Sequence, residues 1–155
     1  MTPVRAYVAL GANLGERERT LRASVDALAA EPGIELLAVS ALRETEPVGV
    51  GAQPRFLNGA VELETTLPAR DLLERLLVVE RRFGRVREGV PAHGPRTVDL
   101  DLLVYGGEMI DEPGLHVPHP RLHERRFVLE PLAELAPGLV VPGLGRVEDL
   151  LAAVH

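Results

Sequence analysis

Along the chain, segments whose hydrophobic residues follow the pattern of a β-strand alternate with segments whose hydrophobic residues recur at the spacing of an α-helix. Residues 4–10 are largely apolar and predict a buried strand. After the turn GANLG, Leu21, Val25 and Leu28 recur at the spacing of a helix that packs one face against a core. Pro32 ends this pattern, because proline cannot continue a regular helix. The N-terminal part of the chain is therefore predicted to be a strand followed by a helix.

The same alternation continues in the middle of the chain. Residues 34–42 and 56–64 predict two strands joined by a loop that contains glycine and proline. Pro68 opens a second helix, which is expected to end at Gly84. Residues 97–104 predict a further strand. The second helix is expected to turn five apolar side chains inward: Leu72, Leu73, Leu76, Leu77 and Val79.

The order of these elements, β-α-β-β-α-β, predicts an α+β fold of the ferredoxin-like type, in which helices cover one face of an antiparallel sheet. A C-terminal extension is expected to add a hairpin near residues 108–117, a helical stretch near 127–135 and a last helix from Val147 onward. Neither a repeat nor an interdomain linker is evident. We therefore expect residues 1–155 to form a single domain.

Charge and composition narrow the classes of function. The net charge of −6 is evidence against a nucleic-acid coat, because proteins that bind the phosphate backbone usually carry a basic excess. The chain lacks cysteine, which excludes disulfides and a cysteine nucleophile, and it lacks lysine, which excludes a P-loop lysine. No leader-like segment and no run of roughly 18 apolar residues is present. A soluble, cytoplasmic protein that binds neither nucleic acid nor membrane is expected.

Two aspartates are the first candidates for chemistry. Asp99 and Asp101 lie in the strand predicted over residues 97–104, where alternate side chains point to the same face. Their Cα atoms would lie roughly 7 Å apart, so both carboxylates could bind the same metal or a pair of metals. Mg²⁺ suits such a pair, since it accepts one or two carboxylates and completes its shell with water and substrate phosphates. Taken alone, the D-x-D pattern is equally compatible with a solvated strand face.

Arginines close to the aspartates favour a phosphate ligand. Arg81 and Arg82 fall in the last turn of the predicted helix, where their charges suit the helix dipole. Arg85, Arg87 and Arg96 lie in the loop that leads to Asp99, and for these we favour a functional role. Metal ions together with guanidinium groups are what phosphoryl transfer requires.

Other residues that could form sites are less specific. Four of the five histidines fall between positions 93 and 123, namely His93, His116, His119 and His123. A zinc site is not favoured, because Pro120 interrupts the one H-x-x-x-H pair, His119 and His123. We favour a hydrogen bond from His119 to a phosphate or nucleotide and surface exposure for His116 and His123. The GANLG segment lacks the spacing of phosphate-binding glycine loops, which favours a plain turn between strand and helix.

Six segments together resemble the 6-hydroxymethyl-7,8-dihydropterin pyrophosphokinase family of folate biosynthesis. They are YVALGANLG, TEPVG, FLNGAVELET, FGRVR, GPRTVDLDLLVYG and VPHPRLHERRFVLEPLAELAP, and they extend over nearly the whole chain. The resemblance implies transfer of diphosphate from ATP to the hydroxymethyl oxygen of the pterin, with release of AMP. It also implies that Asp99 and Asp101 bind two Mg²⁺ ions.

The resemblance assigns roles to further residues. Arg85 and Arg96 would act in catalysis beside the two aspartates. The residues on the ATP side would be Glu80, Arg87, Leu102, His119 and Arg125. Those on the pterin side would be Thr45, Pro47, Val48, Phe56, Asn58 and Phe127, with the asparagine hydrogen-bonded to the ring and the two phenylalanines stacked on its faces.

The chain also departs from the family pattern. His93 stands where many relatives carry tryptophan or another large residue, in a loop, EGVPAH, that is one residue longer. Pro120 stands where relatives can carry tyrosine, and Glu46 where they can carry proline. Glycines and a proline around the arginines suggest a lid over ATP. Two alternatives remain: a Mg²⁺-dependent phosphohydrolase and a ferredoxin-like module that binds a small metabolite. A monomer is expected.

Overall fold

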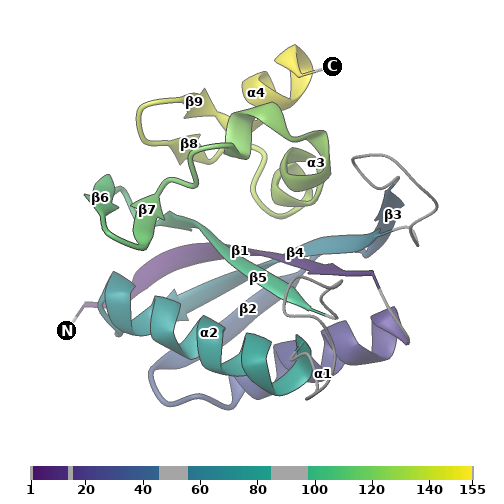
Figure 1. Ribbon diagram of the computed structural model, residues 1–155. Helices are drawn as coiled ribbons and strands as arrows, with labels where there is room; N and C mark the ends of the chain where they lie inside the picture. The colour runs from purple at the N-terminus through teal and green to yellow at the C-terminus, as the bar shows by residue number, and fades with distance from the viewer. Residues whose placement is uncertain (1, 14–15, 46–55, 85–97, 155) are drawn as a thin grey trace.

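The computed structural model describes residues 2–13, 16–45, 56–84 and 98–154 (Figure 1). In chain order, the elements are β1 (Val4–Ala12), α1 (Arg17–Ala29), β2 (Ile34–Val39), β3 (Arg43–Thr45), β4 (Phe56–Thr65), α2 (Ala69–Gly84), β5 (Asp99–Tyr105), β6 (Ile110–Glu112), β7 (Leu115–Val117), the 3₁₀ turn η1 (Leu122–Glu124), α3 (Arg126–Leu135), β8 (Val140–Val141), β9 (Gly145–Arg146) and α4 (Val147–Ala153).

The central sheet has the strand order β2-β4-β1-β5, and each of these neighbouring pairs is antiparallel. With α1 and α2 as the two connections, this is the ferredoxin-like arrangement predicted from the sequence. The short strand β3 pairs with β4 as well, next to the end of β2. The two hairpins β6–β7 and β8–β9 lie outside this sheet.

The strand predicted over residues 34–42 ends earlier than expected, and a short strand that was not predicted follows it. β2 ends at Val39, and β3 begins at Arg43. Between them, Ser40 keeps one ladder bond from its backbone N–H to the carbonyl of Ala60, while its hydroxyl accepts the N–H of Ala60 and donates to the carbonyl of Ala41. A serine side chain thus replaces part of the backbone ladder, which apolar alternation alone does not reveal.

Helices cover both faces of the sheet. In Figure 1, α1 and α2 lie on one side of the sheet and α3 and α4 lie on the other. Along β1, Ala6 and Val8 join the hydrophobic cluster that includes α1 and α2, whereas Tyr7 packs with the residues of α3. The sequence predicted a helical layer on one face only, so the C-terminal extension supplies the second layer. A strand buried on both faces shows little alternation, which explains the largely apolar sequence of β1.

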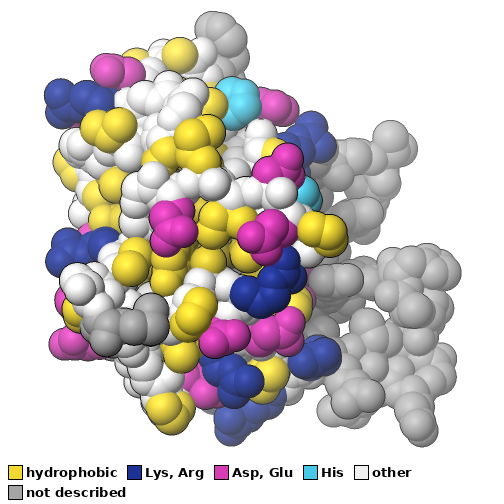
Figure 2. Space-filling view, turned by 90° about the vertical axis from the view of Figure 1, so that its left-hand side faces the viewer, with side chains coloured by type: hydrophobic (Ala, Val, Ile, Leu, Met, Phe, Trp, Pro, Cys, Tyr) yellow, Lys and Arg dark blue, Asp and Glu magenta, His cyan; other side chains and the backbone are white. Residues whose placement is uncertain are grey.

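The inward face of α2 agrees with the prediction. Leu72, Leu76 and Val79 are buried, while Leu73 and Leu77 are half-buried. At the end of the connection from α1, Gly33 adopts a positive φ of 85°, a conformation that glycine tolerates better than other residues. No helix in the described part of the chain is long and apolar enough to cross a membrane. Figure 2 shows acidic and basic side chains interspersed with apolar ones on the face that carries β6 and β7.

Candidate active site

Asp99 and Asp101 lie on one face of β5, as strand alternation predicts. β5 is an edge strand, and its register with β1 pairs Gly11 with Asp99 and Ala9 with Asp101. Asp99 is half-buried and Asp101 is exposed, whereas Leu100 between them is buried on the opposite face. The two carboxylates therefore emerge on the face of the sheet that α3 covers in part.

A row of residues crosses the sheet at this point. Asn58 of β4 is the Cα partner of Gly11, which is in turn the partner of Asp99. A Cβ atom at Gly11 would lie 3.2 Å from Oδ1 of Asn58. Because it has no side chain, Gly11, the first glycine of GANLG, leaves space in the site between the amide of Asn58 and the carboxylate of Asp99. This role was not predicted from the sequence, where GANLG indicated only a turn.

The larger of two cavities at the aspartates has a volume of about 640 Å³. Four residues predicted for the pterin side line it together: Thr45, Phe56, Asn58 and Phe127. The side-chain amide of Asn58 donates a hydrogen bond to the hydroxyl of Thr45. The two phenylalanines come from different elements, β4 and α3. Pro47 and Val48, predicted for the same wall, lie outside the described residues.

The smaller cavity has a volume of about 350 Å³ and contains three of the residues predicted for the ATP side: Glu80, Leu102 and His119. Asp99 and Asp101 line this cavity as well as the larger one. Arg125, which was grouped with the ATP side, lines the larger cavity. The two aspartates therefore stand where the two cavities meet.

His119 is held in a defined orientation and protonation state. Its Nδ1 accepts the backbone N–H of Arg121 at 3.2 Å, so a neutral ring carries its proton on Nε2. Burial lowers the pKa of His119, an effect that the carboxylate of Asp101 opposes and the guanidinium groups of Arg125 and Arg121 reinforce. A neutral ring with its donor on Nε2 can hydrogen-bond to a phosphate oxygen.

Glu80 contacts the strand that carries the aspartates. Its Oε2 accepts the backbone N–H of Leu100 at 2.9 Å. Because β5 is an edge strand, this N–H points away from β1 and needs a partner outside the sheet. Glu80 thus fixes the backbone between Asp99 and Asp101, a positioning role that sequence reasoning missed.

Arginines also contribute to the site. The guanidinium of Arg125 lies over the ring of Phe127, 5.7 Å from its centroid. Arg121 and Arg126 line the larger cavity too, and they were not singled out from the sequence although both belong to the segment VPHPRLHERRF. The guanidinium of Arg82 lies 5.0 Å from the ring centroid of Phe83, in accord with a local role at the end of α2.

The predicted catalytic and lid residues are only partly described. Arg85, Arg87 and Arg96 lie outside the described residues, as do His93 and the rest of the loop predicted to close over ATP. His116 and His123 are exposed, as expected, and His116 also lines the smaller cavity. Within the described ranges, no group of three or more histidine, aspartate or glutamate side chains could hold a metal. A site with two carboxylates remains compatible with Mg²⁺, which takes further ligands from water and phosphate.

The chain is similar in sequence to a family of known proteins. Residues 7–137 match the family described as 7,8-dihydro-6-hydroxymethylpterin-pyrophosphokinase (HPPK). The chain is 46% identical over 149 residues to the 2-amino-4-hydroxy-6-hydroxymethyldihydropteridine pyrophosphokinase of Pseudomonas aeruginosa, covering 96% of this chain and 91% of that protein. It is 48% identical over 130 residues to the protein of the same name from Bacillus subtilis, covering 84% and 77% of the two chains.

The fold has similar solved structures. A crystal structure of HPPK-DHPS in complex with substrates matches with a TM-score of 0.75 at 10% identity, covering 99% of this chain and 43% of that one. The HPPK-DHPS of Plasmodium falciparum matches with a TM-score of 0.63 at 10% identity, covering 96% of this chain and 43% of that one. This chain thus spans less than half of each of these longer chains, and at such identity the likeness shows the fold alone.

The match to the family extends over most of the chain and includes every strand of the central sheet apart from the first residues of β1. The chain therefore belongs to the 6-hydroxymethyl-7,8-dihydropterin pyrophosphokinase family, and it is an ATP-dependent enzyme that transfers diphosphate to the hydroxymethyl group of the pterin in folate biosynthesis.

Proposed function

We propose that the larger cavity binds the pterin, that the smaller cavity binds ATP, and that Asp99 and Asp101 hold the Mg²⁺ required where the two substrates meet. The observation that carries this proposal is that both aspartates line both cavities. A reaction between two bound molecules needs their reacting atoms in contact. The junction of the cavities offers such a place.

In the larger cavity, the side chains suit a flat, polar heterocycle. Phe56 of β4 and Phe127 of α3 supply aromatic side chains, against which a ring can stack. Asn58 offers an amide that can both donate and accept hydrogen bonds along the edge of a pterin, and Thr45 holds that amide in place. Pro47 and Val48 complete our proposed pterin set.

In the smaller cavity, the groups suit a nucleotide. Leu102 supplies an apolar wall, and the Nε2 proton of His119 is available to a phosphate oxygen. Arg125 lines the larger cavity beside the aspartates, where its guanidinium can bind phosphate oxygens of ATP. We assign Arg87 and Glu80 to the ATP side, and we assign Arg85 and Arg96 the stabilisation of charge on the transferred group.

The donor set at the junction fits magnesium. Asp99 and Asp101 are hard oxygen ligands on one strand face, and ATP brings the phosphate oxygens that Mg²⁺ prefers as further ligands. We propose two ions, held by these two carboxylates. When bound, they would offset phosphate charge and lower the pKa of the pterin hydroxyl.

The reaction we propose at the junction joins the hydroxymethyl oxygen of the pterin to the β-phosphorus of ATP. The bond that breaks links this phosphorus to the oxygen that leaves with AMP, and the proton of the hydroxyl is released to solvent as the new bond forms. The described residues orient the two substrates and neutralise charge, as phosphoryl transfer demands.

We further propose that the enzyme acts as a single-domain monomer, since residues of one chain line both cavities. We propose the cytoplasm as its location, because ATP is supplied in that compartment.

One assay tests the proposed reaction. AMP and inorganic phosphate are measured from ATP and Mg²⁺, with and without 6-hydroxymethyl-7,8-dihydropterin. We expect AMP to form only when the pterin is present, in equal amount to diphosphorylated pterin. Phosphate release without pterin would indicate a phosphohydrolase, binding without any product would indicate a binding module, and either result would contradict the proposal.

A further inference from the structure

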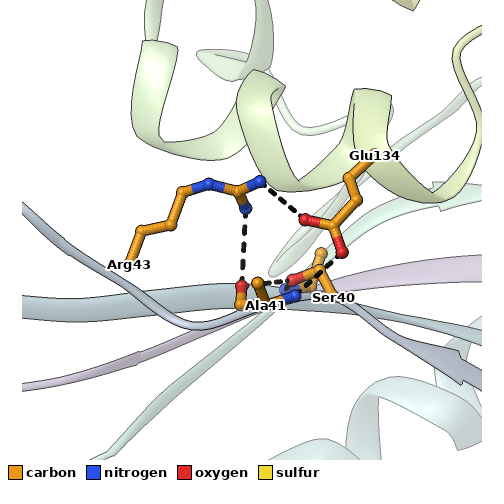
Figure 3. A network of polar contacts seen from close by, with 5 residues as sticks. Ser40, Ala41, Arg43 and Glu134 are labelled. Atoms are coloured by element: carbon orange, nitrogen blue, oxygen red, sulfur yellow. Dashed lines mark hydrogen bonds and ion pairs between the residues drawn. The ribbon is translucent and has the colours of Figure 1, made fainter.

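A polar network joins α3 to the segment between β2 and β3 (Figure 3). The carboxylate of Glu134 accepts two hydrogen bonds, from the backbone N–H of Ala41 at 2.9 Å and from the guanidinium of Arg43 at 2.6 Å. The guanidinium of Arg43 also donates to the carbonyl of Ala41 at 3.4 Å. Glu134, Arg43 and Ala41 together are called the clamp below.

Each side of the clamp belongs to an element that also lines the larger cavity. On α3, Phe127 stands seven positions before Glu134, which is two helical turns and therefore the same helix face. On β3, Thr45 stands two positions after Arg43, which is the same strand face. Phe127 and Thr45 both line the larger cavity, and the clamp ties the elements that carry them.

The sheet register connects the clamp to the aspartates. Arg43 is the Cα partner of Asn58, which belongs to the row that continues through Gly11 to Asp99. Any shift of β3 relative to α3 therefore changes the spacing between Phe127 and the Thr45–Asn58 pair. The described residues that line the smaller cavity come from α2, β5 and residues 114–120, so a shift of β3 relative to α3 does not move them directly.

The clamp differs from the other ion pair on the same helix. Glu130 meets Arg126 at 3.9 Å within one helix, although the guanidinium of Arg126 also donates to the carbonyl of Val154. Exposed ion pairs contribute little to stability, and the side chains of Arg43 and Glu134 are themselves 37% and 36% exposed, so the hydrogen bond from the Ala41 backbone is what distinguishes the clamp. The Glu134 carboxylate instead uses both oxygens, one of them on a backbone N–H that has a fixed direction. The hydrogen bond from Ala41 and the charge of Arg43 lower the pKa of Glu134, which agrees with both groups contacting its carboxylate.

We propose that Glu134 is a positioning residue of the pterin site. Together with Arg43, it sets the distance across the larger cavity between α3 and the strands β3 and β4, and this distance sets the affinity for the pterin. This inference rests on the proposed placement of the pterin in the larger cavity. It assigns Glu134 no contact with either substrate.

The test measures the dissociation constants of pterin and ATP separately by calorimetric titration, the pterin in the presence of Mg²⁺ and a non-hydrolysable ATP analogue. Glu134→Ala should weaken pterin binding roughly fivefold and leave ATP binding unchanged, because a charged hydrogen bond between the walls is lost. Glu134→Gln keeps an acceptor for Ala41 and should fall between wild type and Glu134→Ala. Arg43→Ala added to Glu134→Ala should cause little further loss, since the two residues act as one unit.

Two matched variants make the result decisive. Glu130→Ala, on the same helix, should leave pterin affinity unchanged, and thermal unfolding verifies that each variant is folded. If Glu134→Ala affects pterin affinity no more than Glu130→Ala does, or weakens ATP binding equally, the inference is wrong.

Phe56→Ala tests the placement of the pterin separately from the role of Glu134. If it leaves pterin affinity unchanged, the pterin is not in the larger cavity, and both the proposed pterin site and the role of Glu134 are wrong.

Discussion

The two faces of the central sheet differ in how completely they are covered. On the face that α1 and α2 cover, Val8 and Leu100 form one continuous buried cluster with residues of these helices. On the other face, Tyr7 and Leu103 pack with residues from α3 and α4. That cover stops short of Asp101, which is exposed beside both cavities.

This difference separates stability from chemistry within the same strands. Because alternate residues of a strand point to opposite faces, β5 supplies leucines to a closed core and carboxylates to an open site. Substitutions at closed-face positions that line neither cavity should therefore lower the free energy of unfolding without changing the chemistry of the folded enzyme. Substitutions on the open face should lower activity and change the free energy of unfolding little.

The largest effect is expected for the aspartates. Asp99→Ala and Asp101→Ala should each lower turnover by about a thousandfold, because each removes a ligand from the metal that meets the transferred group. Initial rates of pterin-dependent AMP formation measure this loss, and thermal unfolding should show little change. Turnover near that of the wild type in both variants would refute the metal assignment.

A core substitution on the closed face should have the next largest effect. Leu72 of α2 has no exposed surface, so Leu72→Ala should lower the free energy of unfolding by about 3 kcal/mol through lost contacts and a cavity. Val78→Ala, at a position that is 37% exposed on the same helix, is the control and should cost far less. Urea unfolding measures both. An equal loss in the two variants, or a large drop in turnover for folded Leu72→Ala, would break the distinction between the faces.

The smallest effect is expected for a substitution at Gly11, which lies between Asn58 and Asp99 in the open site. In Gly11→Ala the new Cβ would lie 3.2 Å from Oδ1 of Asn58, so this amide must shift by a few tenths of an ångström. We expect KM for the pterin to rise severalfold with little change in kcat or in KM for ATP, because only the ground-state contact with the pterin is altered. Gly107→Ala, where a Cβ would meet nothing within 4 Å, should change neither constant. Equal KM values in the two variants would remove Gly11 from the site.

Much of the fold could be predicted from local pattern. Hydrophobic period gave the two helices of the ferredoxin-like core and its strands, because each element buries the face that its own period defines. The shared face of Asp99 and Asp101 follows from the same alternation. The early end of strand 34–42 at Val39 and the short strand β3 were missed, because the break between them depends on hydrogen bonds of the Ser40 hydroxyl rather than on apolar residues.

What local pattern could not give is contact between distant segments. The pairing of Glu134 with Ala41 and Arg43 joins residues more than ninety positions apart. The role of Gly11 depends on its register between Asn58 and Asp99, which are contributed by two other strands. The second helical layer was missed for the same reason, since the period of α3 shows that one face is buried but not which surface covers it.

The placement of the two substrates can be tested most directly by a crystal structure of the enzyme with Mg²⁺, a non-hydrolysable ATP analogue and 6-hydroxymethyl-7,8-dihydropterin. The account predicts the pterin between Phe56 and Phe127, the nucleotide beside His119 and Leu102, and metal bound to both Asp99 and Asp101. Metal bound away from these two aspartates, or the two substrates in exchanged cavities, would contradict it.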